Sequence, residues 1–107
     1  MSKATCHKLI SQIAYKRHPF CEKCGGPFHS PHHVFGRGNN ATAFTPEYVV
    51  SLCASCHDNF NIPHFKAWLA ETRGYDWYTE GWRISRFTIK DRLMDFTALA
   101  KGLRKLL

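Results

Sequence analysis

The sequence predicts a small α+β fold, and three observations favour it. Apolar residues recur with a helical period near both ends of the 107-residue chain. The middle, about residues 20–62, is rich in Gly, Pro, Cys, His and Asn, which is typical of loops and short strands. Four of the five cysteines form two C-x-x-C pairs, a spacing that favours a metal site. We therefore expect a single domain over residues 1–107, in which helical segments 3–17 and 63–107 wrap a metal-organised centre.

The first helix is expected over about residues 3–17, before Pro19. Its apolar residues share one face: Leu9, Ile10, Ile13 and Ala14. A helical pattern resumes over residues 65–71 and is expected to end at Gly74, a residue that commonly follows the last turn of a helix. The sequence thus predicts one helix on each side of the central segment.

The last helix is expected from about Ile89 to Lys105, with Thr88 as its N-cap and Asp91 in its first turn. Its predicted buried stripe consists of Ile89, Leu93, Phe96, Leu99, Ala100 and Leu103. Aromatic residues precede this helix: Tyr75, Trp77, Tyr78, Trp82 and Phe87. The first four could stack on unpaired bases, but such residues more often pack into a core, and we expect core packing for them.

The cysteine pairs predict a structural zinc site. They are Cys21/Cys24 and Cys53/Cys56. Each C-x-x-C turn presents two thiolates, and two such turns complete a tetrahedral set of four. Gly25 and Gly26 follow the first pair and permit a positive-φ turn. Four sulfur ligands would leave the zinc no open position for substrate, and Cys6 is expected to be a buried thiol in the first helix.

The charge of the chain favours a polyanionic partner. Fifteen Lys and Arg stand against eight Asp and Glu, for a net charge of +7. Nucleic acid is the commonest partner of such a surface, although charge that only aids solubility is the alternative. We expect no membrane span and no signal peptide, since apolar runs of the required length are absent from the sequence. The expected location is the cytoplasm, where thiols stay reduced.

A group of histidines lies between and just after the cysteine pairs. His32 and His33 are adjacent, and His57 follows the last cysteine directly. Adjacent residues of a strand point to opposite sides, so His32 and His33 would have different roles. One imidazole could bind a divalent ion together with His57, while the other takes a proton from water. The alternatives are surface hairpin residues for the pair, and a helix-end hydrogen bond or a contact with a zinc sulfur for His57. His29 and His64 are expected to face solvent or to make local hydrogen bonds.

The ordered motifs C-x-x-C, His-His-Val-x-Gly-Arg and Leu-Cys-x-x-Cys-His resemble those of the HNH, or ββα-metal, endonucleases. The resemblance covers about residues 20–62 and implies a zinc-stapled ββα-metal core. It implies His33 as general base, His32, His57 and Asn61 as ligands of a catalytic Mg²⁺ or Mn²⁺, and Arg37 near the scissile phosphate. The implied function is DNA hydrolysis to 5′-phosphate and 3′-hydroxyl ends. One such site would nick one strand, in a monomer or weak dimer.

The sequence departs from the family pattern at Tyr48, five residues before Cys53, where these enzymes usually carry an Asn that braces the loop of the general base. Tyr48, Asn39 or Asn40 could take over this role. Asn61 is alternatively a helix-end residue before Pro63. The departure supports a second interpretation, a non-catalytic zinc module that binds nucleic acid. A purely structural zinc protein would explain neither the charge nor the histidines.

Overall fold

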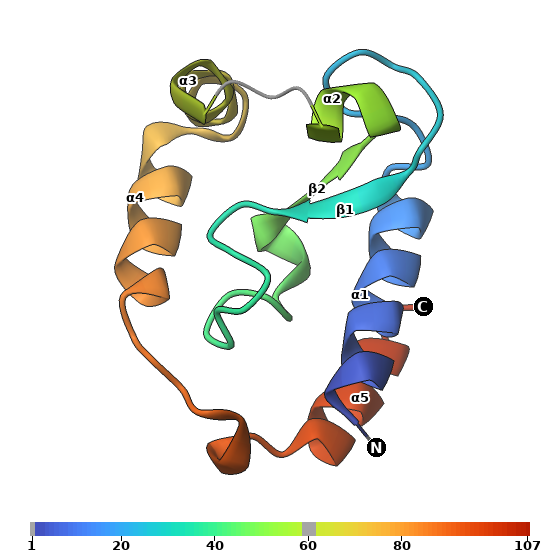
Figure 1. The fold of residues 1–107 in the computed structure, drawn as a ribbon, viewed down its shortest axis with the longest axis vertical. Helices are drawn as coiled ribbons and strands as arrows, with labels where there is room; N and C mark the ends of the chain where they lie inside the picture. Colours follow the sequence, from blue (N-terminus) through green and yellow to red (C-terminus); the bar gives the residue numbers. More distant parts are fainter. Residues whose placement is uncertain (1, 59–61) are drawn as a thin grey trace.

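The structure of the chain is a computed structural model that describes residues 2–58 and 62–107, without the side chains of residues 62 and 63. These residues form five α-helices and a two-stranded antiparallel sheet, which confirms the α+β prediction (Figure 1). The elements are α1 (Lys3–Arg17), β1 (Ser30–His33), the 3₁₀ turn η1 (Pro46–Tyr48), β2 (Val49–Leu52), α2 (Ala54–Asp58), α3 (Ile62–Arg73), α4 (Tyr75–Ser85), the 3₁₀ turn η2 (Asp91–Leu93) and α5 (Phe96–Arg104). None of the described helices is long and apolar enough to cross a membrane.

Helix α1 has the predicted bounds because both of its ends are capped. The Ser2 hydroxyl accepts a hydrogen bond from the Thr5 N–H, and the chain leaves the helix at His18, just before Pro19. One face is buried against the sheet and α5: Cys6, Leu9, Ile10, Ile13 and Ala14. Figure 1 shows α5 lying along α1. The first and last helices of the chain therefore pack against each other on one side of the sheet.

The β1–β2 hairpin separates two apolar cores. The register pairs His32 with Val50 and His33 with Val49. Val49 belongs to the core that α1 and α5 build, whereas Val50 belongs to a second core with residues of α3. Because strand residues alternate between faces, the side chain of His32 lies on the same side of the sheet as Val50, and that of His33 on the same side as Val49.

Helix α4 lies in the aromatic stretch, for which the sequence indicated packing but no helix. Trp77 and Tyr78 are half-buried and contact Phe35 at ring-centroid distances of 6.1 and 5.5 Å. The expectation of core packing is therefore right for these two residues. It is wrong for Tyr75 and Trp82, which are 68% and 49% exposed. Phe87, which follows α4, is exposed as well (61%).

The last helix begins later than predicted. Asp95 is its N-cap, since its carboxylate accepts a 3.0 Å hydrogen bond from the Ala98 N–H. Thr88 is therefore not the cap, and residues 91–93 form only a short 3₁₀ turn. Two members of the predicted stripe lie outside α5 and are exposed, Ile89 (36%) and Leu93 (68%), whereas those within α5 are buried or half-buried against α1.

Candidate functional site

The four cysteines of the two C-x-x-C pairs come together beside the hairpin. The Sγ atoms of Cys21, Cys24, Cys53 and Cys56 all lie within 4.8 Å of one another. The Sγ atoms of Cys24 and Cys53 are 3.5 Å apart, and all four thiols are free. Within the described part of the chain, this is the one group of three or more His, Cys, Asp or Glu donors at such distances. The cluster could hold a structural metal.

Backbone hydrogen bonds close the first turn and attach it to β2. The Cys21 N–H donates to the Gly26 carbonyl at 2.7 Å, and the Gly25 N–H donates to the Cys21 carbonyl at 2.9 Å. Gly25 has a φ of +80°, which favours glycine. The Glu22 N–H then donates to the Ser51 carbonyl at 2.9 Å, just before the second cysteine pair. The strand therefore brings two turns together that are far apart in sequence.

The electrostatics of the cluster suit a cation. Burial, together with the neighbouring sulfur atoms, raises the pKa of Cys56. Backbone N–H groups of Cys24 and Cys53 lower the pKa of Cys21 despite its burial. The Cys21 thiolate therefore lies near the Cys56 thiol, whose ionisation is disfavoured, and a bound cation would favour ionisation of both. Cys6 lies apart, buried in α1 as predicted, with its thiol donating to the Phe96 carbonyl at 3.4 Å.

His32 lies on the face of the hairpin that α2 and α3 cover. Its ring centroid is 5.7 Å from that of His57 and 5.0 Å from that of Phe65. Burial and the neighbouring His57 lower the pKa of His32 to about 4, so the imidazole is neutral at pH 7. A neutral imidazole nitrogen can act as a metal ligand, and the two adjacent rings bring two such nitrogens close together.

His33 lies on the opposite face, toward α1. Burial lowers the pKa of His33 to about 4, with further lowering by His7 and Arg37, while a hydrogen bond with the backbone of Ala43 raises it. An open pocket of about 660 Å³ extends from His33 across α1 and α2. The ionisable residues that line it are His7, Lys8, His29, His33, Arg37 and His57. No carboxylate belongs to this described lining, so the pocket suits an anion.

The loop after β1 folds back onto His33. The Gly36 N–H donates to the His33 carbonyl at 3.1 Å, and the Ala43 N–H donates to the Asn39 carbonyl at 2.8 Å. The Asn39 amide group donates in turn to the Ser85 carbonyl at the end of α4, at 2.5 Å. Asn39 is therefore tied into the loop that reaches the ring of His33.

Tyr48 has a different environment. Its ring lies 5.6 Å from Phe35 and 5.7 Å from Trp77, within the aromatic cluster beside α4. Its backbone carbonyl accepts a hydrogen bond from the Val34 N–H at 3.1 Å. The side chain of Tyr48 thus packs against α4, whereas Asn39 and Asn40 make polar side-chain contacts from the loop.

His7 is a site residue to which the sequence analysis assigned no role. Its ring centroid lies 5.7 Å from that of His33, edge to face, and 4.7 Å from that of Phe44. Its Nδ1 atom is buried without a partner among the described residues. One feature of the sequence could have indicated a role for His7. Ala4, His7, Lys8 and Ser11 follow helical spacing on one face of the first helix, and all four line the pocket.

The remaining candidates are distributed as follows. Arg37 is exposed and lines the pocket with His33 and His57. Asn61, the predicted third ligand, lies outside the described residues. His29 and His64 are exposed, as expected. The pocket therefore joins three of the predicted residues, His33, Arg37 and His57, with His7 of α1, whereas His32 lines a separate hollow beside α3.

Comparisons with known proteins identify no relative. No family model matches the chain, and neither the curated proteins nor the solved structures yield a match.

Proposed function

We propose that this protein is a zinc-stabilised, divalent-metal-dependent DNA endonuclease of the HNH type. The observation that carries the proposal is the division of two adjacent histidines between the faces of β1. His32 lies beside His57, and His57 in turn lines the pocket that holds His33 and Arg37. Hydrolysis of a phosphodiester needs a base, a Lewis acid and a cationic contact to the phosphate, and these residues can supply all three.

Zinc is the metal that four cysteine thiolates in two C-x-x-C turns favour. Cys21, Cys24, Cys53 and Cys56 would hold it. Its role would be structural, because four sulfur ligands complete its coordination. In a chain of 107 residues, such a site would contribute much of the stability of the fold.

In the proposed reaction, an imidazole nitrogen of His33 takes a proton from a water molecule. The water oxygen forms a bond to phosphorus as the bond from phosphorus to the 3′-oxygen breaks, and the departing oxygen takes a proton from solvent water, which leaves a 5′-phosphate and a 3′-hydroxyl. The guanidinium of Arg37 offsets negative charge on the phosphate. His32 and His57 would hold Mg²⁺ or Mn²⁺, which when bound stabilises the phosphate and the departing oxygen.

The charge around the pocket supports DNA as the substrate. Lys8 and Arg37 are exposed at the pocket, and Lys66 lines a neighbouring hollow with His32 and His33. Positive side chains therefore lie on the α1 side and the α3 side of β1. Such residues bind phosphates of the backbone without regard to sequence.

The direct test is cleavage of supercoiled plasmid with Mg²⁺ or Mn²⁺ added. A single site cuts one strand per event, so open-circular DNA should appear before linear DNA. Linear DNA without an open-circular intermediate would contradict single-strand nicking. Absence of cleavage on plasmid, junction and single-stranded DNA would contradict the nuclease proposal as a whole.

A non-catalytic zinc module that binds nucleic acid is the second candidate. One observation favours it: within the described residues, His32 and His57 belong to no set of three His, Cys, Asp or Glu donors that all lie within 4.8 Å of one another. This module would bind DNA in a salt-sensitive manner and leave plasmid uncut with either ion. The plasmid assay and a binding assay at two salt concentrations therefore separate the candidates.

A further inference from the structure

A separate hollow, of about 410 Å³, lies away from the histidine pocket, between the loop after β1 and the segment that follows α4. Phe35, Gly36, Gly38 and Asn39 line it from the loop, and Phe87, Thr88 and Ile89 line it from the segment after α4; Asn40 contributes to its wall as well. This volume is within the usual range of small-ligand sites.

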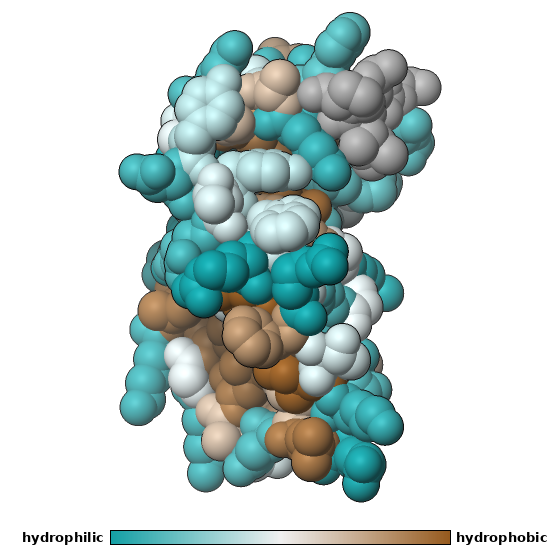
Figure 2. All heavy atoms as spheres, turned by 90° about the vertical axis from the view of Figure 1, so that its left-hand side faces the viewer, coloured by the Kyte–Doolittle hydropathy of each residue, from teal (hydrophilic) through white to brown (hydrophobic). Residues whose placement is uncertain are grey.

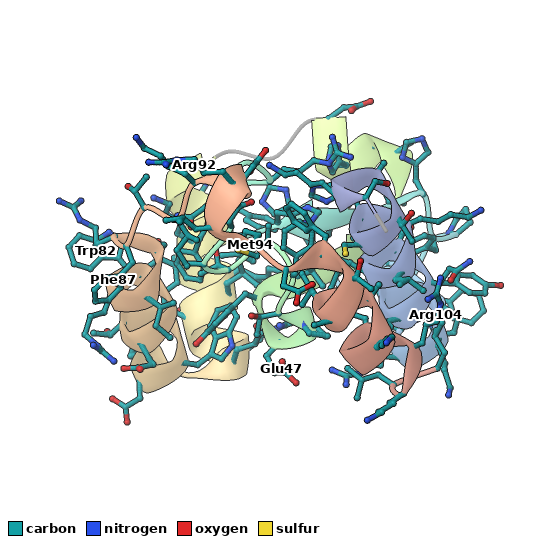
Figure 3. All side chains as sticks on the ribbon, turned by 90° about the horizontal axis from the view of Figure 1, so that it is seen from below. Glu47, Trp82, Phe87, Arg92, Met94 and Arg104 are labelled. Atoms are coloured by element: carbon teal, nitrogen blue, oxygen red, sulfur yellow. The ribbon has the colours of Figure 1, made fainter. Side chains whose placement is uncertain are left out.

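Phe87 presents an aromatic surface at this hollow. Its side chain is 61% exposed, although a phenyl ring in a small protein is normally buried. Figure 2 shows apolar side chains gathered on the lower half of this face, over the segment after α4, with hydrophilic residues around them. In Figure 3, Phe87 and Trp82 both point outward at the outer side of α4. The ring is therefore free to stack on a planar ligand.

Asn40 adds an unmatched hydrogen-bond acceptor. Its side chain is 8% exposed, and its amide group donates to the Ile89 carbonyl at 2.8 Å and to the Asp91 carboxylate at 2.7 Å. Both partners are acceptors, which fixes the orientation of the amide. The Oδ1 atom is buried and has no partner among the described residues. Because buried polar atoms are normally paired, Oδ1 lacks a donor, and Asn40 is part of the wall of the hollow.

Charge and position indicate a nucleic acid as the source of this ligand. Exposed Arg86 and Lys90 flank the segment that carries Phe87. Asp91 is already paired with Lys3, at 2.9 Å. The loop that lines the hollow also places Arg37 in the histidine pocket, so a DNA strand at His33 can continue over Gly36 and Gly38 to Phe87.

We propose that this hollow binds an unpaired nucleobase of the DNA substrate, which stacks on Phe87 and donates an exocyclic N–H to Asn40 Oδ1. The inference rests on the proposed function for its substrate, and it specifies DNA that carries an unpaired nucleotide next to the cut. An aromatic ring binds any base by stacking, and the amide oxygen adds a preference for bases with an amino group.

Fluorescence anisotropy without added Mg²⁺ or Mn²⁺ tests the site, with three labelled duplexes: fully paired, with one bulged adenine, and with a bulged abasic nucleotide. We expect the bulged adenine to bind about tenfold more tightly than the other two, the size expected for one base on one aromatic ring. The variant Phe87→Ala should lose this preference, while affinity for the paired duplex stays within about twofold. Leu93→Ala is the matched control, because Leu93 is 68% exposed and does not line the hollow.

Equal affinity of the wild type for all three duplexes would overturn the proposal, as would a preference that survives in Phe87→Ala. A fourth duplex with a bulged purine that lacks the amino group tests the role of Asn40. Binding as tight as that of adenine would overturn the hydrogen bond to Oδ1. These results do not depend on catalysis: a protein that selects the bulge and cuts nothing would contradict only the proposed nuclease function.

Discussion

The cysteine cluster and the histidine pocket lie beside the same hairpin but are built in different ways. Two short turns supply all four sulfur atoms of the cluster, and β2 ties them together. The pocket instead takes its residues from α1, β1, the loop after β1, and α2, and it stays open. The four cysteine sulfurs of the cluster can support the fold by holding a metal, whereas the open pocket, with residues from several elements, can admit a substrate. We expect changes at the cluster to affect folding and changes at the pocket to affect activity.

The largest expected effect is that of removing a cluster sulfur. Cys53→Ser should lose the metal and unfold the protein at 25 °C, because a structural zinc site contributes on the order of 10 kcal/mol. Circular dichroism and metal quantification would check this. Cys6→Ala is the control, since Cys6 lies outside the cluster, and it should keep the metal. A Cys53→Ser protein with the wild-type unfolding temperature would show that the cluster does not support the fold.

A substitution on the α4 side should destabilise the protein without removing the metal. A Cβ at Gly81 would lie 2.3 Å from a Phe35 ring atom and 2.9 Å from a Tyr48 ring atom. We expect Gly81→Ala to lower the free energy of unfolding by about 1–3 kcal/mol through overpacking.

Gly102→Ala is the matched control for this prediction. A Cβ there meets nothing within 4 Å, inside α5. It should stabilise the protein by up to about 1 kcal/mol, because alanine favours helix. Thermal unfolding measures both variants, and equal effects of the two would contradict the close packing at Gly81.

Glu22 connects the first cysteine turn to α3 and to β2. Its carboxylate accepts hydrogen bonds from Arg73 at 2.9 Å and from the Ser51 N–H at 2.6 Å, and both side chains of the ion pair are mostly buried. Glu22→Gln should lower the free energy of unfolding by about 1–2 kcal/mol. Glu47→Gln removes the exposed pair with Arg17 and should cost less than about 1 kcal/mol. Chemical denaturation should rank the two in this order.

The smallest expected effect concerns His7, whose ring contacts His33 and Phe44. His7→Ala should reduce the cleavage rate at saturating DNA by about tenfold, because His33 would lose the ring that restrains its orientation. His7→Phe keeps an aromatic ring at this position and should retain most of the rate. Equal rates for His7→Ala and the wild type would place His7 outside the catalytic arrangement.

The parts of the fold that local signals control could be predicted from the sequence. Proline and polar caps set the ends of α1, and C-x-x-C spacing indicated the cluster. The start of α5 could not be predicted from local signals: these favour Thr88 as the N-cap, with Asp91 in the first turn, and neither residue caps the helix. Asp91 is used in a long-range contact with Lys3 and Asn40, which leaves Asp95 to cap the helix.

Strand alternation predicted that His32 and His33 point to different sides, and the register agrees. The contribution of His7 could not be predicted in the same way. It depends on how α1 packs across the hairpin, which is a tertiary contact that no local pattern encodes.

The central claim is that His33 is the base of a phosphodiester-hydrolysing site. The most direct measurement compares plasmid nicking by the wild type, His33→Ala and His18→Ala, with fold and metal content checked for each. His18 is a matched control because it lies outside the histidine pocket. The account predicts that His33→Ala lowers the nicking rate by about 10²–10⁴-fold, while His18→Ala stays within a few-fold of the wild type. A folded, metal-bound His33→Ala variant that nicks plasmid as fast as the wild type would contradict the account.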